Sequence, residues 1–291
     1  MSNSGTKLHG KNGALYIGGA KGSGGIKVAA KSEWSLQRNR DYIDATVFGD
    51  RVYVISTTTY SSEGPSTLRC VNMKTGRVEQ SQSFPWRSGP MAADQDHLII
   101  ASCHWLHVLD RRFRPLMAFY DGGSNAPILS GRFLVDTGWY WDAHGYDIDR
   151  KMVLWELGAR RGTVHCLATT RSGRQIVIEY DRAFHVIGID LQTGRILWKQ
   201  KMLLNDYDGY LGAGALAAVT GSTAVVPGWS SQNRSGRLGP GGFYAFDCDN
   251  GKLVWKFERP EVAGAAVVIS KNHVYGLDSM GRLYRFSTRQ P

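Results

Sequence analysis

One hairpin motif recurs along the chain and limits the fold more than any other feature of the sequence. In its two clearest copies, at residues 185–198 and 243–255, a strand-like run leads to an Asp, a Gly stands four residues after it, and a second run reaches a Trp. The residues of these copies are Asp190, Gly194 and Trp198, and Asp247, Gly251 and Trp255. Weaker copies lie at residues 68–78, 107–110 and 146–155. Each copy predicts a β-hairpin, because the Asp or Asn side chain accepts a hydrogen bond from the backbone N–H two residues on and Gly supplies a positive φ.

The spacing of these hairpins predicts the architecture. The steps between equivalent positions are 38, 37, 43 and 57 residues, starting from Asn72 and ending at Asp247. A period near 40 with short strands is typical of a β-propeller, and turn signals every eight to twelve residues support an all-β class. We therefore predict a six-bladed β-propeller with four-stranded blades. We expect the tryptophans of the motif, Trp155, Trp198 and Trp255, to be buried between blades.

The last repeat is too short for four strands. Only five residues follow the run at 274–286, so the outermost strand of the sixth blade is missing there. Residues 33–38, which contain Trp34, have the composition of that strand. We predict that they complete the sixth blade and close the ring, because an open ring would expose strand edges. The domain prediction is a Gly-rich N-terminal arm at residues 1–30 and a propeller at residues 31–291.

Composition and charge limit the functions to consider. The chain has 42% hydrophobic and 21% charged residues, enough apolar content for a core, and a formal net charge of +10. That charge favours acidic partners, although no nucleic-acid reading module is present, so nucleic acid is not the expected partner. No apolar run approaches the length of a membrane span, which argues against membrane insertion. The first ten residues contain no apolar signal region, so we expect cytoplasmic synthesis without a signal peptide.

The repeats at Asp190–Trp198 and Asp247–Trp255 resemble the quinoprotein-like, or PQQ-like, β-propeller repeat family. The resemblance extends over residues 31–291. That family includes pyrroloquinoline quinone enzymes and non-enzymatic scaffolds such as the outer-membrane assembly lipoprotein of Gram-negative bacteria. Its enzymes are longer and carry a vicinal disulfide and a calcium or lanthanide site. This chain has no adjacent cysteines, so the resemblance implies a scaffold with no bound quinone and no other cofactor.

The N-terminal region has a different resemblance. Residues 9–50 resemble the start of tail-tube-type structural proteins of tailed bacteriophages, through the runs at 9–19, 27–36 and 46–50. This likeness implies a virion-type arm and a role as a tail or surface component. It conflicts with the propeller assignment at Trp34, because one strand cannot serve both folds.

No catalytic or metal-binding set can be assigned from spacing. Residues 18–25 lack the ending of a phosphate loop, the histidines are dispersed, and Asp142, Asp147 and Asp149 lack the pattern of a calcium loop. No nucleophile motif is present. The cysteines stand in apolar contexts without CxxC spacing and are expected to be structural thiols; they are Cys70, Cys103, Cys166 and Cys248.

Several aromatic and basic residues outside the hairpin motif are candidates for binding a ligand or partner. Propellers bind on their loop faces, and indole rings beside arginines suit stacking on sugars or contact with an acidic protein. The alternative is that the rings fill space between blades. The candidates are Trp105, Trp139, Tyr140, Trp141, Trp229, Arg234 and Arg237.

These observations lead to one functional hypothesis and one alternative. The hypothesis is a non-catalytic propeller scaffold that binds a protein, an acidic ligand or a glycan, with the virion role that the N-terminal resemblance implies. The alternative is a reduced quinoprotein-like propeller that still binds a small-molecule cofactor or substrate.

Overall fold

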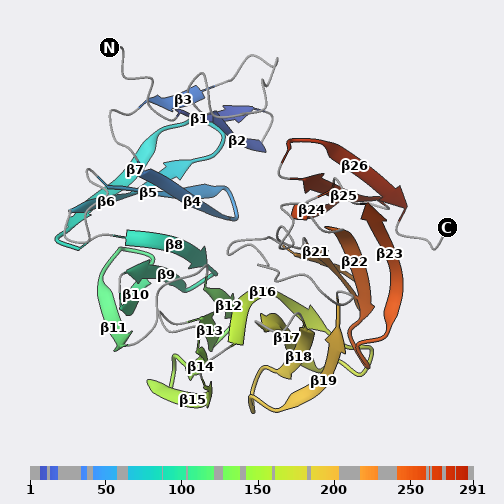
Figure 1. The fold of residues 1–291 in the computed structure, drawn as a ribbon. Helices are drawn as coiled ribbons and strands as arrows, with labels where there is room; N and C mark the ends of the chain where they lie inside the picture. The colour runs from blue at the N-terminus through green and yellow to red at the C-terminus, as the bar shows by residue number, and fades with distance from the viewer. Residues whose placement is uncertain are drawn as a thin grey trace, which may run out of the picture. The chain divides into compact units, whose positions relative to one another are not determined.

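The computed structural model describes residues 7–11, 14–18, 34–37, 42–57, 65–86, 88–102, 104–120, 127–137, 142–158, 161–181, 185–202, 217–228, 241–259, 262, 264–270, 273–278 and 280–287. Every regular element in these ranges is a β-strand, 26 in all (Figure 1), which confirms the all-β class. The chain divides into two compact units, residues 1–129 and 130–291, and each is described by itself. Within the described ranges, none of the chain forms a helix of the length and apolarity that a membrane crossing needs.

The first unit contains three antiparallel sheets, each built from strands that follow one another in the chain. The N-terminal sheet has the order β2-β1-β3, with β1 (Lys7–Lys11), β2 (Ala14–Gly18) and β3 (Trp34–Gln37). The next sheet consists of β4 (Tyr42–Phe48), β5 (Arg51–Thr57), β6 (Ser66–Asn72) and β7 (Val78–Phe84). The third consists of β8 (Ser88–Ala93), β9 (His97–Ser102), β10 (Trp105–Asp110) and β11 (Pro115–Tyr120).

The second unit continues the same pattern through four sheets, the first of which begins with the short strand at the boundary between the units. Its strands are β12 (Ile128–Ser130), β13 (Phe133–Thr137), β14 (Ala143–Asp147) and β15 (Met152–Leu157). The next sheet has β16 (Arg161–Thr169), β17 (Gln175–Asp181), β18 (His185–Asp190) and β19 (Ile196–Lys201). Then follow β20 (Ala218–Thr220), β21 (Thr223–Gly228), β22 (Gly241–Asp247) and β23 (Leu253–Arg259). The last sheet has three strands, β24 (Gly264–Ser270), β25 (His273–Asp278) and β26 (Leu283–Ser287).

Six of these sheets, from β4 to β26, correspond to the six predicted blades. Five have four strands and the sixth has three in the described part of the chain. Each predicted repeat of about 40 residues therefore forms one sheet of consecutive antiparallel strands.

The partner of the N-terminal strand differs from the prediction. The strand expected at residues 33–38 is present as β3, but it pairs with β1, with Trp34 opposite Gly10 and Gln37 opposite Lys7. The sixth sheet therefore does not gain its fourth strand from β3, and that part of the closure prediction is wrong. Local pairing has a simple cause, because β1 lies about 25 residues away in the chain, and closing a short loop costs less entropy than pairing with the far end of the chain.

The predicted Asp turns have the expected hydrogen bonds. Asp190 Oδ1 accepts from the backbone nitrogens of Gln192 and Thr193, at 3.1 and 2.9 Å. The Gly of the two clearest predicted turns has a positive φ, 68° at Gly194 and 72° at Gly251. Bonds of the same kind form at Asn72, Asp110, Asp147, Asp247 and Asp278.

Two turns use a residue other than Gly at the positive-φ position. Phe113 has φ 63° and Lys151 has φ 55°. A bulky side chain costs about 1–2 kcal/mol in this conformation. At Phe113 burial offsets that cost, because the ring is fully buried and lies 6.2 Å from the ring of Tyr53, centroid to centroid.

Two motif tryptophans dock on a turn of the following sheet in the second unit. Trp155 is 8% exposed, and its Nε1 donates to the carbonyl oxygen of Leu191 at 2.9 Å. Trp198 is equally buried and donates to the carbonyl oxygen of Cys248 at 2.8 Å. Each indole therefore joins the last strand of one sheet to the Asp turn of the next. This confirms the predicted burial of both rings.

Glycines make room for these rings. A Cβ at Gly188, which lies opposite Trp198 in the neighbouring strand, would stand 2.3 Å from the indole. A Cβ at Gly251, in the turn that receives the ring, would stand 2.5 Å from it. Both distances are too short for any side chain. The Trp155 indole is accommodated in the same way, by Gly145 in the neighbouring strand and by Gly194 in the turn that receives the ring.

Trp255 does not follow this pattern. It is only partly buried, and its ring packs on Phe286 with centroids 5.4 Å apart. The residue opposite it is Ala245, whose methyl group occupies the space that glycine leaves for the other two indoles. The prediction that Trp255 is buried is therefore wrong.

An ion-pair group links two sheets beside the docked indole of Trp198. Arg171, in the turn between β16 and β17, lies 2.6 Å from Asp247 and 2.9 Å from Asp249, measured between nitrogen and oxygen. The arginine side chain is 65% exposed. Because exposed ion pairs are worth at most about 1 kcal/mol, the indoles rather than this group hold the sheets together.

Candidate binding site

An exposed pair of aromatic rings, Trp105 and Tyr120, is the strongest candidate site in the first unit. Trp105 is the first residue of β10 and lies opposite Tyr120, the last residue of β11. Their exposures are 43% and 65%. The ring centroids are 5.0 Å apart and the planes meet at 69°. We call this pair the aromatic corner, because two rings at a steep angle leave an L-shaped surface open to solvent.

A partly buried polar and aromatic stack lies on the same face of the sheet. Residues two apart in a strand share a face, which places His107 beside Trp105. The His107 ring stacks on Trp86 with centroids 4.3 Å apart, and its Nε2 shares a hydrogen bond of 2.9 Å with the Ser102 hydroxyl. Burial lowers the pKa of His107 to about 4, so the ring is neutral at neutral pH.

The Ser102–His107 pair was not predicted from the sequence. The two residues come together because β9 and β10 form a tight hairpin, in which Ser102 lies opposite Trp105. The only sequence signal is a serine five residues before a histidine across a two-residue turn, which is common in hairpins. Ser102 is 5% exposed, so its hydroxyl is directed at the fold rather than at solvent.

The other six predicted binding residues cannot be placed. Their positions lie outside the described residues, and they are Trp139, Tyr140, Trp141, Trp229, Arg234 and Arg237. The backbone of Trp34 is described within β3, and its side chain is not. Of the seven predicted binding residues, Trp105 is thus the one whose surroundings the structure gives.

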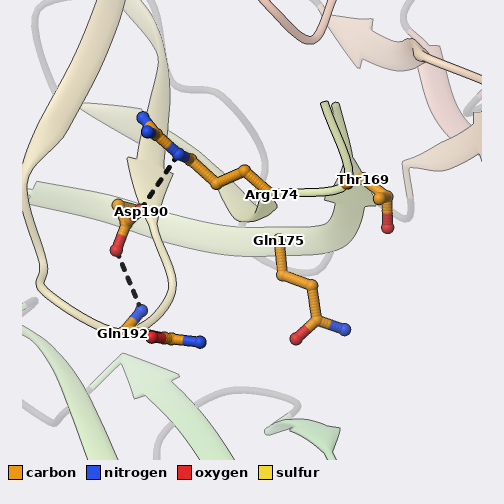
Figure 2. A pocket seen from close by; sticks show the side chains of 6 residues that line it. Thr169, Arg174, Gln175, Asp190 and Gln192 are labelled. Carbon is orange, nitrogen blue, oxygen red and sulfur yellow. Dashed lines mark hydrogen bonds and ion pairs between the residues drawn. The ribbon is translucent and has the colours of Figure 1, made fainter. Parts of the chain in front are cut away.

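A polar pocket of about 350 Å³ lies in the second unit between two turns of the sheet β16–β19 (Figure 2). Arg174 Nε lies 3.6 Å from a carboxylate oxygen of Asp190, and the backbone nitrogen of Gln192 donates to the same carboxylate. Gln175 donates to the hydroxyl of Ser130 at 3.0 Å. These polar groups are engaged in holding the turns, so the pocket is a poor candidate for a ligand. Its lining residues are Thr169, Gly173, Arg174, Gln175, Asp190 and Gln192.

Cysteines and metal-ligating groups add no second candidate. The described cysteines are free thiols. Burial raises the pKa of Cys248 to about 12 and raises the pKa values of Cys70 and Cys166 as well, so all three are protonated at neutral pH. Among the described residues, no group of three or more His, Cys, Asp or Glu side chains is arranged to hold a metal ion.

The comparisons with known proteins agree with the fold. The family model described as outer membrane protein assembly factor BamB matches residues 182–290, so this part of the chain carries a BamB-like propeller repeat. No curated protein matches the sequence. Nothing in the comparisons supports the tail-tube resemblance predicted for residues 9–50 or a virion role.

Three solved structures of similar fold cover 84–98% of the chain. BamB from Moraxella catarrhalis is 16% identical with a TM-score of 0.61, and the match covers 98% of this chain and 81% of that protein. The computationally designed Ika8 protein is 14% identical with a TM-score of 0.61, covering 84% and 70%. The Pan2 WD40 domain of Neurospora crassa is 11% identical with a TM-score of 0.57, covering 84% and 74%. At these identities the likeness shows the fold alone, and the fold of this chain is a β-propeller whose C-terminal part carries the BamB-like repeat.

Proposed function

We propose that this chain is a non-catalytic β-propeller scaffold that binds a protein or glycan partner through the aromatic corner. The observation that carries the proposal is the exposure of Trp105 and Tyr120 side by side at the end of a rigid strand pair. Trp and Tyr are the residue types that supply most binding energy at protein interfaces, and their faces also stack on sugar rings. The formal charge of +10 favours a partner with an acidic surface.

Two further features support binding rather than catalysis. The hydroxyl of Ser102 is buried although it bonds a histidine, and the pKa of that histidine is too low for a general base near neutral pH. The described thiols have raised pKa values, which makes them poor nucleophiles. The absence of a quinone cofactor stays a prediction. We do not extend the proposal to a virion role, because no comparison supports it.

The experiment compares binding by the wild-type chain with Trp105→Ala and Tyr120→Ala. An exposed residue of the other unit, Met280, provides the matched control Met280→Ala, since it is 74% exposed. The probes are an oligosaccharide array and a displayed library of acidic peptides. We expect ligands whose affinity falls about ten-fold or more in the two corner variants and is unchanged in the control.

Two results would contradict the proposal. If no ligand from the array or the library loses affinity in the corner variants, the corner is not the site. Dye reduction by the chain with pyrroloquinoline quinone, calcium and an alcohol or sugar would show that it is an enzyme. Thermal melting of each variant separates loss of binding from loss of fold, and the corner variants should melt close to wild type because neither ring belongs to the buried core.

A further inference from the structure

The sixth sheet ends in a strand whose outer edge has no strand partner in the described part of the chain. In the five complete sheets the third strand pairs on both sides, as β22 does with β21 and β23. The equivalent third strand of the last sheet is β26, which pairs with β25 only. An edge of this kind offers a row of backbone donors and acceptors to an incoming strand.

The register of the last hairpin shows which groups that edge presents. The backbone nitrogen of Asp278 donates to the carbonyl oxygen of Arg282 at 3.0 Å, which makes these two a hydrogen-bonded pair. Bonded and non-bonded pairs alternate in an antiparallel ladder. Gly276 with Tyr284 is therefore bonded, whereas Leu283 and Arg285 direct their backbone N–H and C=O groups to the open edge.

The side chains beside this edge favour an anionic occupant. Leu283 is 68% exposed, and Arg285 is exposed and forms no ion pair with the described residues. On the opposite face, Tyr284 and Phe286 pack on Phe257 with centroids 5.2 Å away. A strand that added to β26 would place alternate residues beside Arg285 and beside this aromatic face, which suits alternating acidic and apolar side chains.

A second copy of the chain fits this edge less well. Antiparallel pairing of β26 with its own copy over the full strand would put Arg285 directly opposite the same arginine of the copy. Like charges directly opposite each other destabilise a sheet.

We infer that β26 is an acceptor for an extended, acidic segment of a partner protein, which adds to the last sheet as its fourth strand. The mode is strand addition, in which main-chain bonds give affinity and alternate side chains give specificity. This rests on the proposed scaffold function, but it uses a different surface from the aromatic corner.

The test uses a blocked ten-residue peptide that alternates glutamate and valine, with a lysine–valine peptide as the charge control. A third peptide, N-methylated on alternate residues, cannot donate along one edge. Binding is measured by fluorescence anisotropy, and hydrogen exchange reports on the amides of Leu283 and Arg285. We expect the glutamate peptide to bind and to slow exchange at these two amides, and the other two peptides to bind at least ten-fold more weakly.

Three substitutions at one position separate charge from backbone pairing. Arg285→Pro removes an outward N–H while leaving the bonds to β25, a position at which edge strands accept proline, and should abolish binding. Arg285→Glu should weaken it at least ten-fold, and Arg285→Ala by less. Equal peptide binding by wild type and Arg285→Pro would overturn the inference, as would a concentration-dependent dimer that Arg285→Pro disperses. Ligands whose affinity depends on Trp105 and Tyr120 should bind Arg285→Pro as well as they bind wild type, so failure at β26 and failure at the aromatic corner are read separately.

Discussion

The docked indole of Trp198 allows a quantitative test of what holds neighbouring sheets together. Trp198→Ala removes a ring that is 8% exposed and leaves the buried carbonyl oxygen of Cys248 without its donor. Truncating a buried Trp to Ala costs about 3–5 kcal/mol. A buried acceptor left unpaired costs about 1–3 kcal/mol. The total loss should therefore be about 5 kcal/mol, the upper end of the range for truncating a buried Trp.

The matched control is Trp255→Ala. Trp255 stands at the same place in the next sheet but is only partly buried and faces Ala245 rather than glycine. Its truncation should cost clearly less, about 2 kcal/mol or below, because less apolar area returns to water. A third variant, Trp198→Phe, keeps most of the apolar ring and loses the N–H, so it isolates the hydrogen bond.

Urea denaturation gives the free energy of unfolding, and thermal melting gives a second measure. For a unit of this size about 1 kcal/mol corresponds to 2–4 °C, so a loss of about 5 kcal/mol in Trp198→Ala should lower the melting temperature by roughly 10–20 °C. Equal losses for Trp198→Ala and Trp255→Ala would refute the argument that docking on the turn, rather than ring area alone, stabilises the unit. So would a loss below about 1 kcal/mol for Trp198→Ala.

Three other predictions concern a turn glycine, the partly buried His107 and an exposed ion pair. Gly194→Ala should lower the free energy of unfolding, measured by urea titration, more than Gly173→Ala does. Both glycines have a positive φ, but only at Gly194 would the added methyl group stand 2.5 Å from an indole. Equal losses of unfolding free energy would count against docking. Burial lowers the pKa of His107 from 6.5 to about 4, so the free energy of unfolding should fall as pH drops from about 6.5 to about 4, and His107→Gln should reduce that fall. Arg171→Ala should cost less than about 1 kcal/mol at 50 mM salt and nothing measurable at 1 M, because its ion pair with Asp247 is exposed; a loss that persists at high salt would contradict this.

The local structure was the part that the sequence predicted well. The hairpins at Asp190 and Asp247 form as expected, since a carboxylate that caps its own turn and a glycine at positive φ are decided within five residues. Pairing partners were harder to predict. Residues 34–37 have the composition of a fourth strand, but composition does not state which edge a strand joins, and β1 lies closer in the chain.

Features that depend on a single residue in the neighbouring strand could not be predicted from the sequence either. The partial exposure of Trp255 follows from a methyl group at Ala245, which is visible only once the register is known. The candidate site shows the same limit, because Trp105 was predicted whereas Tyr120 emerged only as its partner across the hairpin. Phe113 in a left-handed turn has no sequence signal, because its burial against Tyr53 depends on how two sheets pack.

The docking of indoles on the following sheet has a consequence for synthesis of the chain. Trp155 is 36 residues ahead of its acceptor at Leu191, and Trp198 is 50 residues ahead of Cys248. A ribosome that adds about 5–20 residues per second would therefore leave each ring without its acceptor for roughly 2–10 s. During that interval the ring is an apolar surface on a nascent chain, open to a chaperone or to a neighbouring nascent chain until the next turn has been made.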